Sequence, residues 1–164
     1  GERTFEAAAY LRRYGADPHA VSQLFKEDDA SVILRAKIIT EMKKPIPGLA
    51  VSVHSGGAQN DRNVSVVVAQ AADELLTMND IHVSAVLNES DDGVSISARS
   101  DGSVNVQTMM EELGGGGHQT VAGVQIKGAK AEDLIPKIIE MAKEQMKESD
   151  SDEGNSAEGR KEVG

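Results

Sequence analysis

The spacing of apolar residues divides the chain into a helical first part and a longer α/β part. Within the first 45 residues, apolar positions recur at helical spacing and are interrupted by helix-start and helix-stop residues. Three helices are therefore expected, over 4–14, after the pair Asp17-Pro18, and after Asp28 or Asp29, the last ending at Pro45 and Pro47.

From residue 46 onward, strand-like apolar segments alternate with helical ones. Strands are expected at 49–54, 64–69, 81–88, 94–99 and 121–126, with Asp92-Gly93 as a hairpin signal. Helices are expected at 70–78, after Asn105 as the N-cap, and over 134–146. The pattern predicts an α/β fold with a mixed sheet of about five strands and flanking helices, preceded by a helical connector.

The last part of the chain has almost nothing to bury. From Ser149 the residues are mainly Ser, Asp, Glu, Gly and Lys, a composition typical of disorder. We therefore divide the chain into a helical connector (1–45), an α/β domain (46–148) and a disordered acidic tail (149–164). Because the chain starts without Met and inside a helical pattern, we expect it to be a piece of a longer protein.

The composition restricts the core and the ligands. Only two Phe and two Tyr occur, so the core must be aliphatic, and the absence of Cys excludes disulfides and thiolate metal sites. The formal net charge of -10 disfavours broad nucleic-acid binding through a basic stripe, but leaves open a small anion in a local pocket. There is no apolar run of the ~20 residues that span a bilayer, and no signal peptide.

Four consecutive glycines and a histidine lie between a predicted helix and a predicted strand: Gly114, Gly115, Gly116, Gly117 and His118. One glycine is enough to end a helix. A run without Cβ atoms also lets the backbone approach a ligand and turn its N–H groups outward, and the histidine adds a side chain that can donate or accept. A flexible connector is the alternative, but we favour a ligand-binding loop for nucleotide phosphate.

A second group of candidate residues follows the strand at 94–99. Arg99 stands at a strand end, where α/β sheets often bind ligands, and its planar guanidinium suits a phosphate. The alternative is an exposed Arg99 paired with Asp101. Ser100 could be only a turn residue, and Asn105 is first of all a helix cap.

Catalytic and metal-binding motifs are missing from the sequence. His19, His54 and His82 have no partners at metal-ligand spacing, so surface or edge positions are expected for them. The acidic stretches 27–29 and 91–92 are interpreted as a helix cap and a turn. We expect this chain to lack catalytic machinery of its own.

Four short segments together resemble the DHHA1 domain, the C-terminal, substrate-binding half of DHH-family phosphoesterases. They are Ile-Ser-Ala-Arg-Ser at 96–100, Val-Asn-Val-Gln at 104–107, the glycine run with His118, and Val-Ala-Gly at 121–123. The resemblance covers about 49–146. The leading stretch, 3–18, resembles the connector from the DHH domain. Within this family, the chain is most similar to the membrane-anchored cyclic-di-AMP phosphodiesterases of Gram-positive bacteria.

The resemblance implies a mechanism shared between two domains. The DHH half, which is absent from this chain, would hold paired divalent metals, usually manganese, that activate water. This half would grip the nucleotide: Arg99 and Ser100 would hold phosphate, the glycine backbone would let the nucleotide approach, and His118 would contact phosphate or base. Asn105 also matches a family position. The chain alone would bind no cofactor and would not hydrolyse substrate.

Several alternatives stay open. The parent could be a nanoRNase that degrades short oligonucleotides, and after His118 the sequence Gln-Thr-Val-Ala-Gly departs from the Ala-Ala-Gly type ending of many relatives. A module like the C-terminal part of alanyl-tRNA synthetases is disfavoured by His118 and by the acidic charge. Expected partners are a cyclic dinucleotide or short oligonucleotide and the DHH domain of the same chain, with a homodimer left open. We expect a cytoplasmic domain without membrane contact of its own, in a membrane-anchored parent.

Overall fold

A computed structural model describes residues 17–23, 26–56 and 61–158, and the single positions 6, 9 and 15. The chain forms two compact units, Gly1–Val32 and Ile33–Gly164. The helix predicted over 4–14 falls mostly outside the described residues, although positions 6 and 9 are helical.

The first unit confirms two predicted helix starts. Helix α2 (Pro18–Gln23) follows Asp17, whose carboxylate accepts a hydrogen bond of 3.0 Å from the backbone N–H of His19. Helix α3 (Asp29–Thr40) follows Asp28, whose carboxylate accepts one of 2.7 Å from the N–H of Ser31. Each carboxylate thus satisfies an N–H group that has no partner within its own helix.

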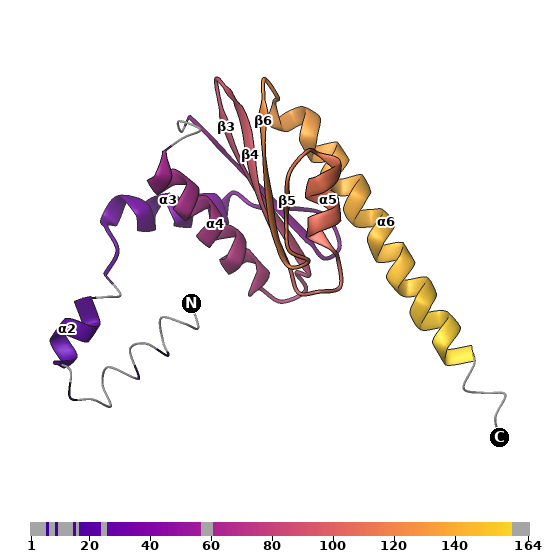
Figure 1. Ribbon diagram of the computed structural model, residues 1–164, viewed down its shortest axis with the longest axis horizontal. Coiled ribbons are helices and arrows are strands. Elements are labelled where there is room, and N and C mark those ends of the chain that lie inside the picture. The colour runs from indigo at the N-terminus through magenta and orange to yellow at the C-terminus, as the bar shows by residue number, and fades with distance from the viewer. Residues whose placement is uncertain are drawn as a thin grey trace. The chain divides into compact units, whose positions relative to one another are not determined.

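The second unit is built on a six-stranded mixed sheet with the order β1-β2-β3-β4-β6-β5 (Figure 1). The strands are β1 (Lys43–Ile46), β2 (Leu49–Ser55), β3 (Val83–Ser90), β4 (Gly93–Ser100), β5 (Gly116–Gly117) and β6 (Val121–Lys127). Only β2 and β3 are parallel; the other described pairs are antiparallel. The α/β class and the mixed sheet are confirmed, as is the hairpin between β3 and β4.

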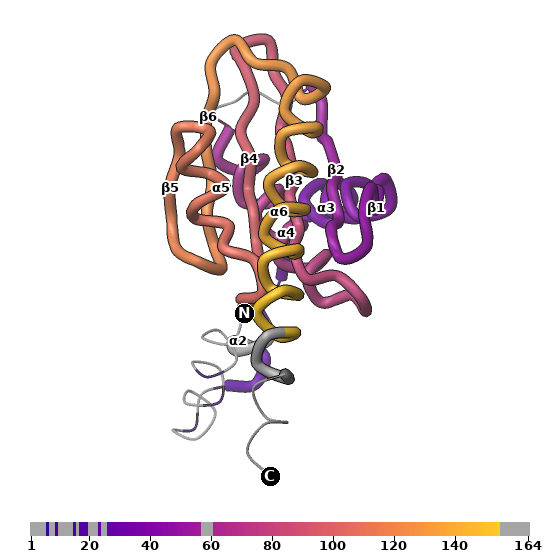
Figure 2. Tube along the Cα trace, turned by 90° about the vertical axis from the view of Figure 1, so that its right-hand side faces the viewer, coloured from indigo at the N-terminus to yellow at the C-terminus, as the bar shows by residue number. Residues whose placement is uncertain are grey.

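Helices cover both faces of the sheet (Figure 1). Helix α4 (Arg62–Leu76) packs on one face together with the last turns of α3, around buried Val86 and Leu75. Helices α5 (Val106–Glu112) and α6 (Ala131–Glu158) pack on the other, and Figure 2 shows α6 in front of the sheet. We call these the α4 face and the α6 face. Because side chains alternate along a strand, each central strand contributes to both.

The strand predicted at 64–69 is wrong, because these residues lie in α4. Five of these six residues are valine or alanine, a composition that resembles a buried strand. However, Asp61 caps a helix there by accepting a hydrogen bond of 2.9 Å from the N–H of Asn63. The helix then buries Val67, Val68, Ala71, Ala72 and Leu75, positions that share one helical face. The small helix penalty of β-branched residues is outweighed by this burial.

Two short strands account for the remaining difference from the expected five. Strand β1 contains Pro45, which is tolerated because β1 is at the sheet edge. Strand β5 consists of two glycines and has no apolar pattern to predict it. Both are recognisable only by their pairing with β2 and β6.

Helix α6 extends beyond residue 149, where the predicted tail begins. The helix continues to Glu158, and after Met146 every side chain described within it is exposed. Pro136 is the sixth residue of α6, beyond the first turn in which its missing N–H would cost little. Residues 159–164 lie outside the described part of the chain. Among the described helices, none has both the length and the apolar character needed to cross a membrane.

Three neighbouring valines in α4 test the helical assignment. Val67 and Val68 are each 2% exposed, whereas Val66 is 55% exposed. Replacing either buried valine by Ala should lower the free energy of unfolding by about 2 kcal/mol, because methyl groups are lost and a cavity remains. Val66→Ala should change it by less than about 0.5 kcal/mol. Urea denaturation followed by circular dichroism measures all three; a strand would instead make one of Val67 and Val68 insensitive.

Candidate functional site

Helix α4 does not cover the whole of the α4 face: the part formed by strands β4, β6 and β5 is left uncovered. Three rows of paired residues point to this side: Arg99 with Val121, Ser97 with Gly123 and Gly116, and Ser95 with Gln125. Paired residues on neighbouring strands share a face. We call these seven residues the open face. Val121 is 45% exposed and Gln125 is exposed, so this part of the sheet is accessible.

A hollow of about 460 Å³ lies over the open face. One wall comes from α4, through Ser65 and Val68, and the floor comes from the strands. Its other residues are Ser95, Ile96, Ser97, Gly115, Gly123, Val124 and Gln125. None of the described residues that line it carries a charge. The hollow is within the size range of small-molecule sites. Gly115, a residue of the glycine run, is part of its lining.

The first two glycines end helix α5. The N–H of Gly115 donates to the carbonyl of Met110 at 2.8 Å, and the N–H of Gly114 donates to that of Glu111 at 3.0 Å. This pair of bonds is a Schellman motif, and it requires a left-handed residue, which Gly114 provides with a φ of 94°. The start of the run is therefore explained by helix capping.

Two of the glycines are also needed for close packing against β6. A Cβ at Gly115 would lie 2.3 Å from the carbonyl oxygen of Gly123, and one at Gly117 would lie 2.5 Å from that of Val121. Gly116 differs, because a Cβ there would meet no described atom within 4 Å. Helix capping and close packing thus explain why three of the four positions are glycine. Gly116, which points to the open face, has no such structural reason.

His118 follows at the tip of the loop. Its backbone N–H donates to the carbonyl of Val121 at 2.7 Å, which closes the turn into β6. The residue is exposed, and its imidazole has no hydrogen-bond partner within the described part of the chain. Since Val121 is the strand neighbour of Arg99, the backbone of His118 lies in the same row as Arg99.

Arg99 is held by α4. Its Nε donates to Oδ1 of Asp73 at 2.7 Å, and its Nη1 donates to the carbonyl of Ala98 at 3.0 Å. The Arg99 side chain is only 12% exposed, whereas that of Asp73 is 64% exposed. These bonds use two of the five N–H groups of the guanidinium, leaving three without a partner among the described residues. The alternative pairing with Asp101 is wrong.

Asp101 belongs to a separate polar cluster. Its Oδ2 lies 2.6 Å from Nδ1 of His82, and its Oδ1 accepts a 2.6 Å hydrogen bond from the hydroxyl of Ser103. Burial opposes ionisation of Asp101, but the hydrogen bonds from Ser103 and His82 together lower its pKa below the usual 3.8. The ionised form therefore stabilises the fold above that value and the contribution is lost as the pH falls below it. These hydrogen bonds connect Asp101, which follows β4, to His82, which precedes β3.

Ser100 and Asn105 were expected in the site, but the structure does not bring their side chains to the open face. Ser100 is 4% exposed, donates to the carbonyl of Val104 and accepts from the N–H of Gly102. As the neighbour of Arg99 in a strand, it points to the opposite face. The amide oxygen of Asn105 accepts from the N–H groups of Gln107 and Thr108 and so caps α5, as predicted. Their roles in ligand binding stay predictions.

Several residues of the open face and its hollow were given no role by the sequence interpretation. Ser95, Ser97 and Gln125 carry a recognisable signal: they alternate with buried apolar residues, which is typical of a sheet with one uncovered face. Ser65 could not be found, because its segment was interpreted as a strand. Gly123 was recognised only as part of a motif, without a role.

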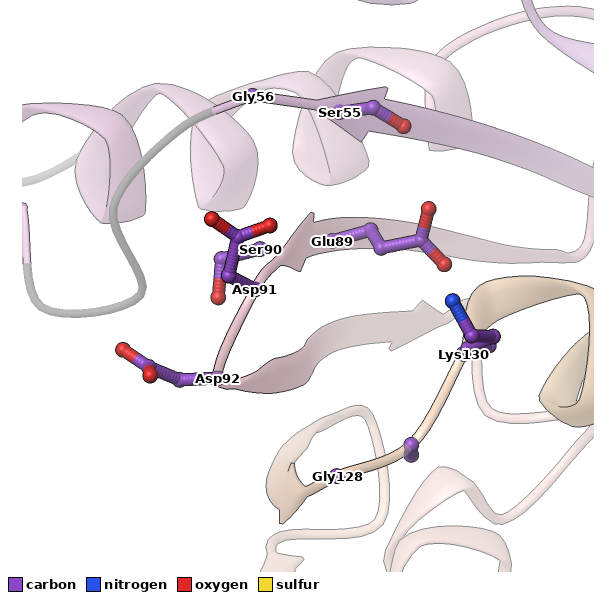
Figure 3. A pocket seen from close by; sticks show the side chains of 9 residues that line it. Ser55, Gly56, Glu89, Ser90, Asp91, Asp92, Gly128 and Lys130 are labelled. Atoms are coloured by element: carbon purple, nitrogen blue, oxygen red, sulfur yellow. The ribbon is translucent and has the colours of Figure 1, made fainter.

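A second hollow, of about 510 Å³, lies at the turn between β3 and β4 (Figure 3). The carboxylates of Asp91 and Asp92 belong to the predicted turn, and that of Glu89 points away from them (Figure 3). Glu89 instead accepts a hydrogen bond of 2.6 Å from the N–H of Ala131 at the start of α6. Among the described residues, no three His, Cys, Asp or Glu side chains are grouped to hold a metal ion.

Ser100→Ala and Asn105→Ala test the structural roles of these side chains. We expect a loss of about 1–3 kcal/mol in unfolding free energy for Ser100→Ala, because it leaves the buried carbonyl of Val104 and the part-buried N–H of Gly102 without their partner. For Asn105→Ala the expected loss is about 1 kcal/mol, the usual value for an N-cap. Ser97→Ala, on the same strand and on the open face, is the matched control. Equal urea midpoints for Ser100→Ala and Ser97→Ala would contradict this description.

Comparison with known proteins gives a family and a set of relatives. Residues 58–148 match the DHHA1 domain family. The cyclic-di-AMP phosphodiesterase GdpP of Geobacillus thermodenitrificans is 46% identical over 127 residues, covering 77% of this chain and 19% of that protein. The cyclic-di-AMP phosphodiesterase PdeA of Listeria monocytogenes is 41% identical over 140 residues, covering 85% and 21%. The chain thus spans about a fifth of these relatives.

More distant similarities are found to another curated protein and to a solved structure. The bifunctional oligoribonuclease and PAP phosphatase NrnA of Thermus thermophilus is 28% identical over 116 residues, covering 69% of this chain and 34% of that protein. The crystal structure of an exopolyphosphatase-related protein from Bacteroides fragilis superimposes with a TM-score of 0.70 at 15% identity, covering 92% of this chain and 45% of that one. The latter likeness concerns the fold alone.

Proposed function

This chain belongs to the DHHA1 domain family, and we propose that it is the substrate-binding half of a phosphodiesterase that hydrolyses cyclic-di-AMP. The carrying observation is that Arg99 and His118 share one row of the sheet and Gly116 lies in the next row, at an uncovered part of one face. Relatives that are 41% and 46% identical are cyclic-di-AMP phosphodiesterases, which supports this substrate. The parent protein would be membrane-anchored, with this domain in the cytoplasm.

The proposed phosphate site uses three kinds of donor. Arg99 offers its remaining guanidinium N–H groups, which bind phosphate with charge-assisted hydrogen bonds. His118 offers a free imidazole, and Gly116 lets the phosphate approach the backbone because no side chain intervenes. Asp73 is a positioning residue, since its bond to Nε fixes the guanidinium before the ligand arrives.

The catalytic metal would be held elsewhere. DHH-family phosphoesterases are expected to use manganese, but the described residues of this chain include no suitable group of metal ligands. This domain's own contribution is therefore to bind and orient the phosphodiester. The DHH domain of the same chain, its expected partner, would supply the metals and the attacking water.

Short oligonucleotides are the second candidate substrate. The observation that favours them is the likeness to NrnA, an oligoribonuclease, at 28% identity. Both substrates present a phosphodiester between nucleosides, so the same donors would serve either. The ratio of kcat/KM for cyclic-di-AMP and for a linear dinucleotide, measured in the complete enzyme, separates the two.

Arg99→Ala and His118→Ala in the complete enzyme test the proposed phosphate site. Each should lower kcat/KM by about 10- to 100-fold, because a charge-assisted hydrogen bond contributes about 1.5–3 kcal/mol. Metal content, measured by elemental analysis, should not change. Lys137→Ala, which removes an exposed charge from α6 on the far face, is the control. Unchanged kinetics in both site variants would exclude this assignment.

Gly116→Ala tests close approach of the ligand to the backbone. Its stability should stay within about 0.5 kcal/mol of the original, since the added methyl group meets open space. Its affinity for nucleotide should fall at least several-fold. Gly115→Ala is the matched contrast and should destabilise the fold by about 1–3 kcal/mol through overpacking. Titration with a dinucleotide at millimolar concentration, followed by NMR, gives both affinities; an unchanged affinity for Gly116→Ala would refute the idea.

A further inference from the structure

The turn that begins at His118 is held by the neighbouring connection between β4 and α5. Its two central residues, Gln119 and Thr120, are exposed, and neither side chain makes a hydrogen bond within the described part of the chain. Their backbone carbonyls are bound from outside the turn. The carbonyl of Thr120 accepts from the N–H of Ser100 at 3.0 Å. The carbonyl of Gln119 accepts from the N–H of Val106, also at 3.0 Å.

One side chain of α6 binds the start of α5. The Oε1 atom of Gln145 accepts a hydrogen bond of 2.6 Å from the N–H of Asn105, and its Nε2 donates to the carbonyl of Asn105 at 3.0 Å. Nε2 also donates to the Oγ1 atom of Thr108 at 2.9 Å. The Gln145 amide thus uses its acceptor and both of its donors. It is half-buried where α6 passes α5 (Figure 1), so its orientation is well defined.

A single peptide group connects Gln145 to the His118 turn. The carbonyl of Asn105 and the N–H of Val106 belong to the same peptide group, which is planar, so the direction of its oxygen fixes the direction of its N–H. Gln145 binds the oxygen, and the carbonyl of Gln119 binds the hydrogen. Hydrogen bonds in such a chain polarise and strengthen one another. Loss of the Gln145 donor should therefore loosen the hold on Gln119.

Helix capping does not account for the contacts of Gln145. The cap of α5 is the side-chain oxygen of Asn105, which accepts from the N–H groups of Gln107 and Thr108. Gln145 binds the two backbone groups of Asn105 instead. It therefore acts on the position of the backbone that carries the Val106 N–H.

We propose that Gln145 is a positioning residue for the phosphate site, which sets the place of the His118 turn through the peptide group between Asn105 and Val106. This rests on the proposed function, in which His118 is a donor to phosphate. Gln145 belongs to the helix on the α6 face, whereas the ligand would bind at the open face on the other side of the sheet. It would thus act on the ligand only through the turn.

The first test is a double-mutant cycle on kcat/KM for cyclic-di-AMP in the complete enzyme. Gln145→Met keeps a similar side-chain length and removes the amide, so it should lower kcat/KM about 3- to 10-fold, as expected for the loss of a hydrogen bond. Added to His118→Ala, it should lower kcat/KM by less than about twofold more, because the group that it positions is already gone. Added to Arg99→Ala, it should keep its full effect, because Arg99 is held by Asp73 instead.

Two further variants show which hydrogen bond matters. Gln145→Glu keeps an acceptor for the N–H of Asn105 but loses the donor to its carbonyl, so it should lower kcat/KM as strongly as Gln145→Met. Gln107→Met is the matched control. It removes the same amide from α5, where Nε2 donates to Oε1 of Glu111 at 3.0 Å, and should leave kcat/KM unchanged.

The position of the turn can also be measured without activity. In the 164-residue chain, hydrogen exchange followed by NMR should be faster at the amide of Val106 in Gln145→Met than in Gln107→Met. The backbone signals of Gln119 and Thr120 should shift in Gln145→Met only. Unchanged exchange at Val106 together with unchanged turn signals would overturn the positioning role.

The kinetic outcomes separate the two proposals. If His118→Ala lowers kcat/KM but Gln145→Met does not, the positioning role is overturned and the phosphate site stands. The positioning role is also overturned if Gln145→Met acts as strongly in the His118→Ala background as alone, or if Gln145→Glu keeps the full kcat/KM. If neither His118→Ala nor Arg99→Ala lowers kcat/KM, the proposed function fails and the positioning role fails with it.

Discussion

The close approach of the glycine loop to strand β6 is the constraint on which the candidate site depends. Gly115 and Gly117 lie so near the β6 backbone that neither position has room for a Cβ. This contact ends α5, creates the short strand β5 and fixes where His118 begins the turn back into the sheet. The loop therefore presents a defined backbone surface. Gly116 lies on the open face, although neither helix capping nor close packing requires a glycine there.

Local features of the fold could be predicted from the sequence because their causes are local. Caps at Asp17, Asp28 and Asn105 depend on one side chain and the N–H groups that follow it. The valine-rich segment in α4 could not be predicted in this way, since valine suits a strand and a buried helix alike. What decides it is the surface that the helix covers, formed by residues such as Val86 that are distant in sequence.

The same distinction applies to the site. The glycine loop and Arg99 were identified from residue type alone, but the partner of Arg99 is Asp73, 26 positions away in the sequence. The orientation of Ser100 could have been derived, because alternation along β4 puts it on the side of Val94, Ile96 and Ala98. Arg99 and Ser100 were expected to hold phosphate together because they are adjacent in sequence. Alternation along the strand places their side chains on opposite faces of the sheet.

The ion pair between Arg99 and Asp73 also reconciles an anion site with an acidic protein. With a net charge of -10, long-range attraction of a phosphate is not available to this chain. Recognition must then come from a few donors fixed at short range. Asp73 binds only Nε, so Arg99 can offer its remaining N–H groups to a ligand while the ion pair stays formed. Such a site would orient a ligand more than it would add affinity, which is what the proposed substrate-binding role requires.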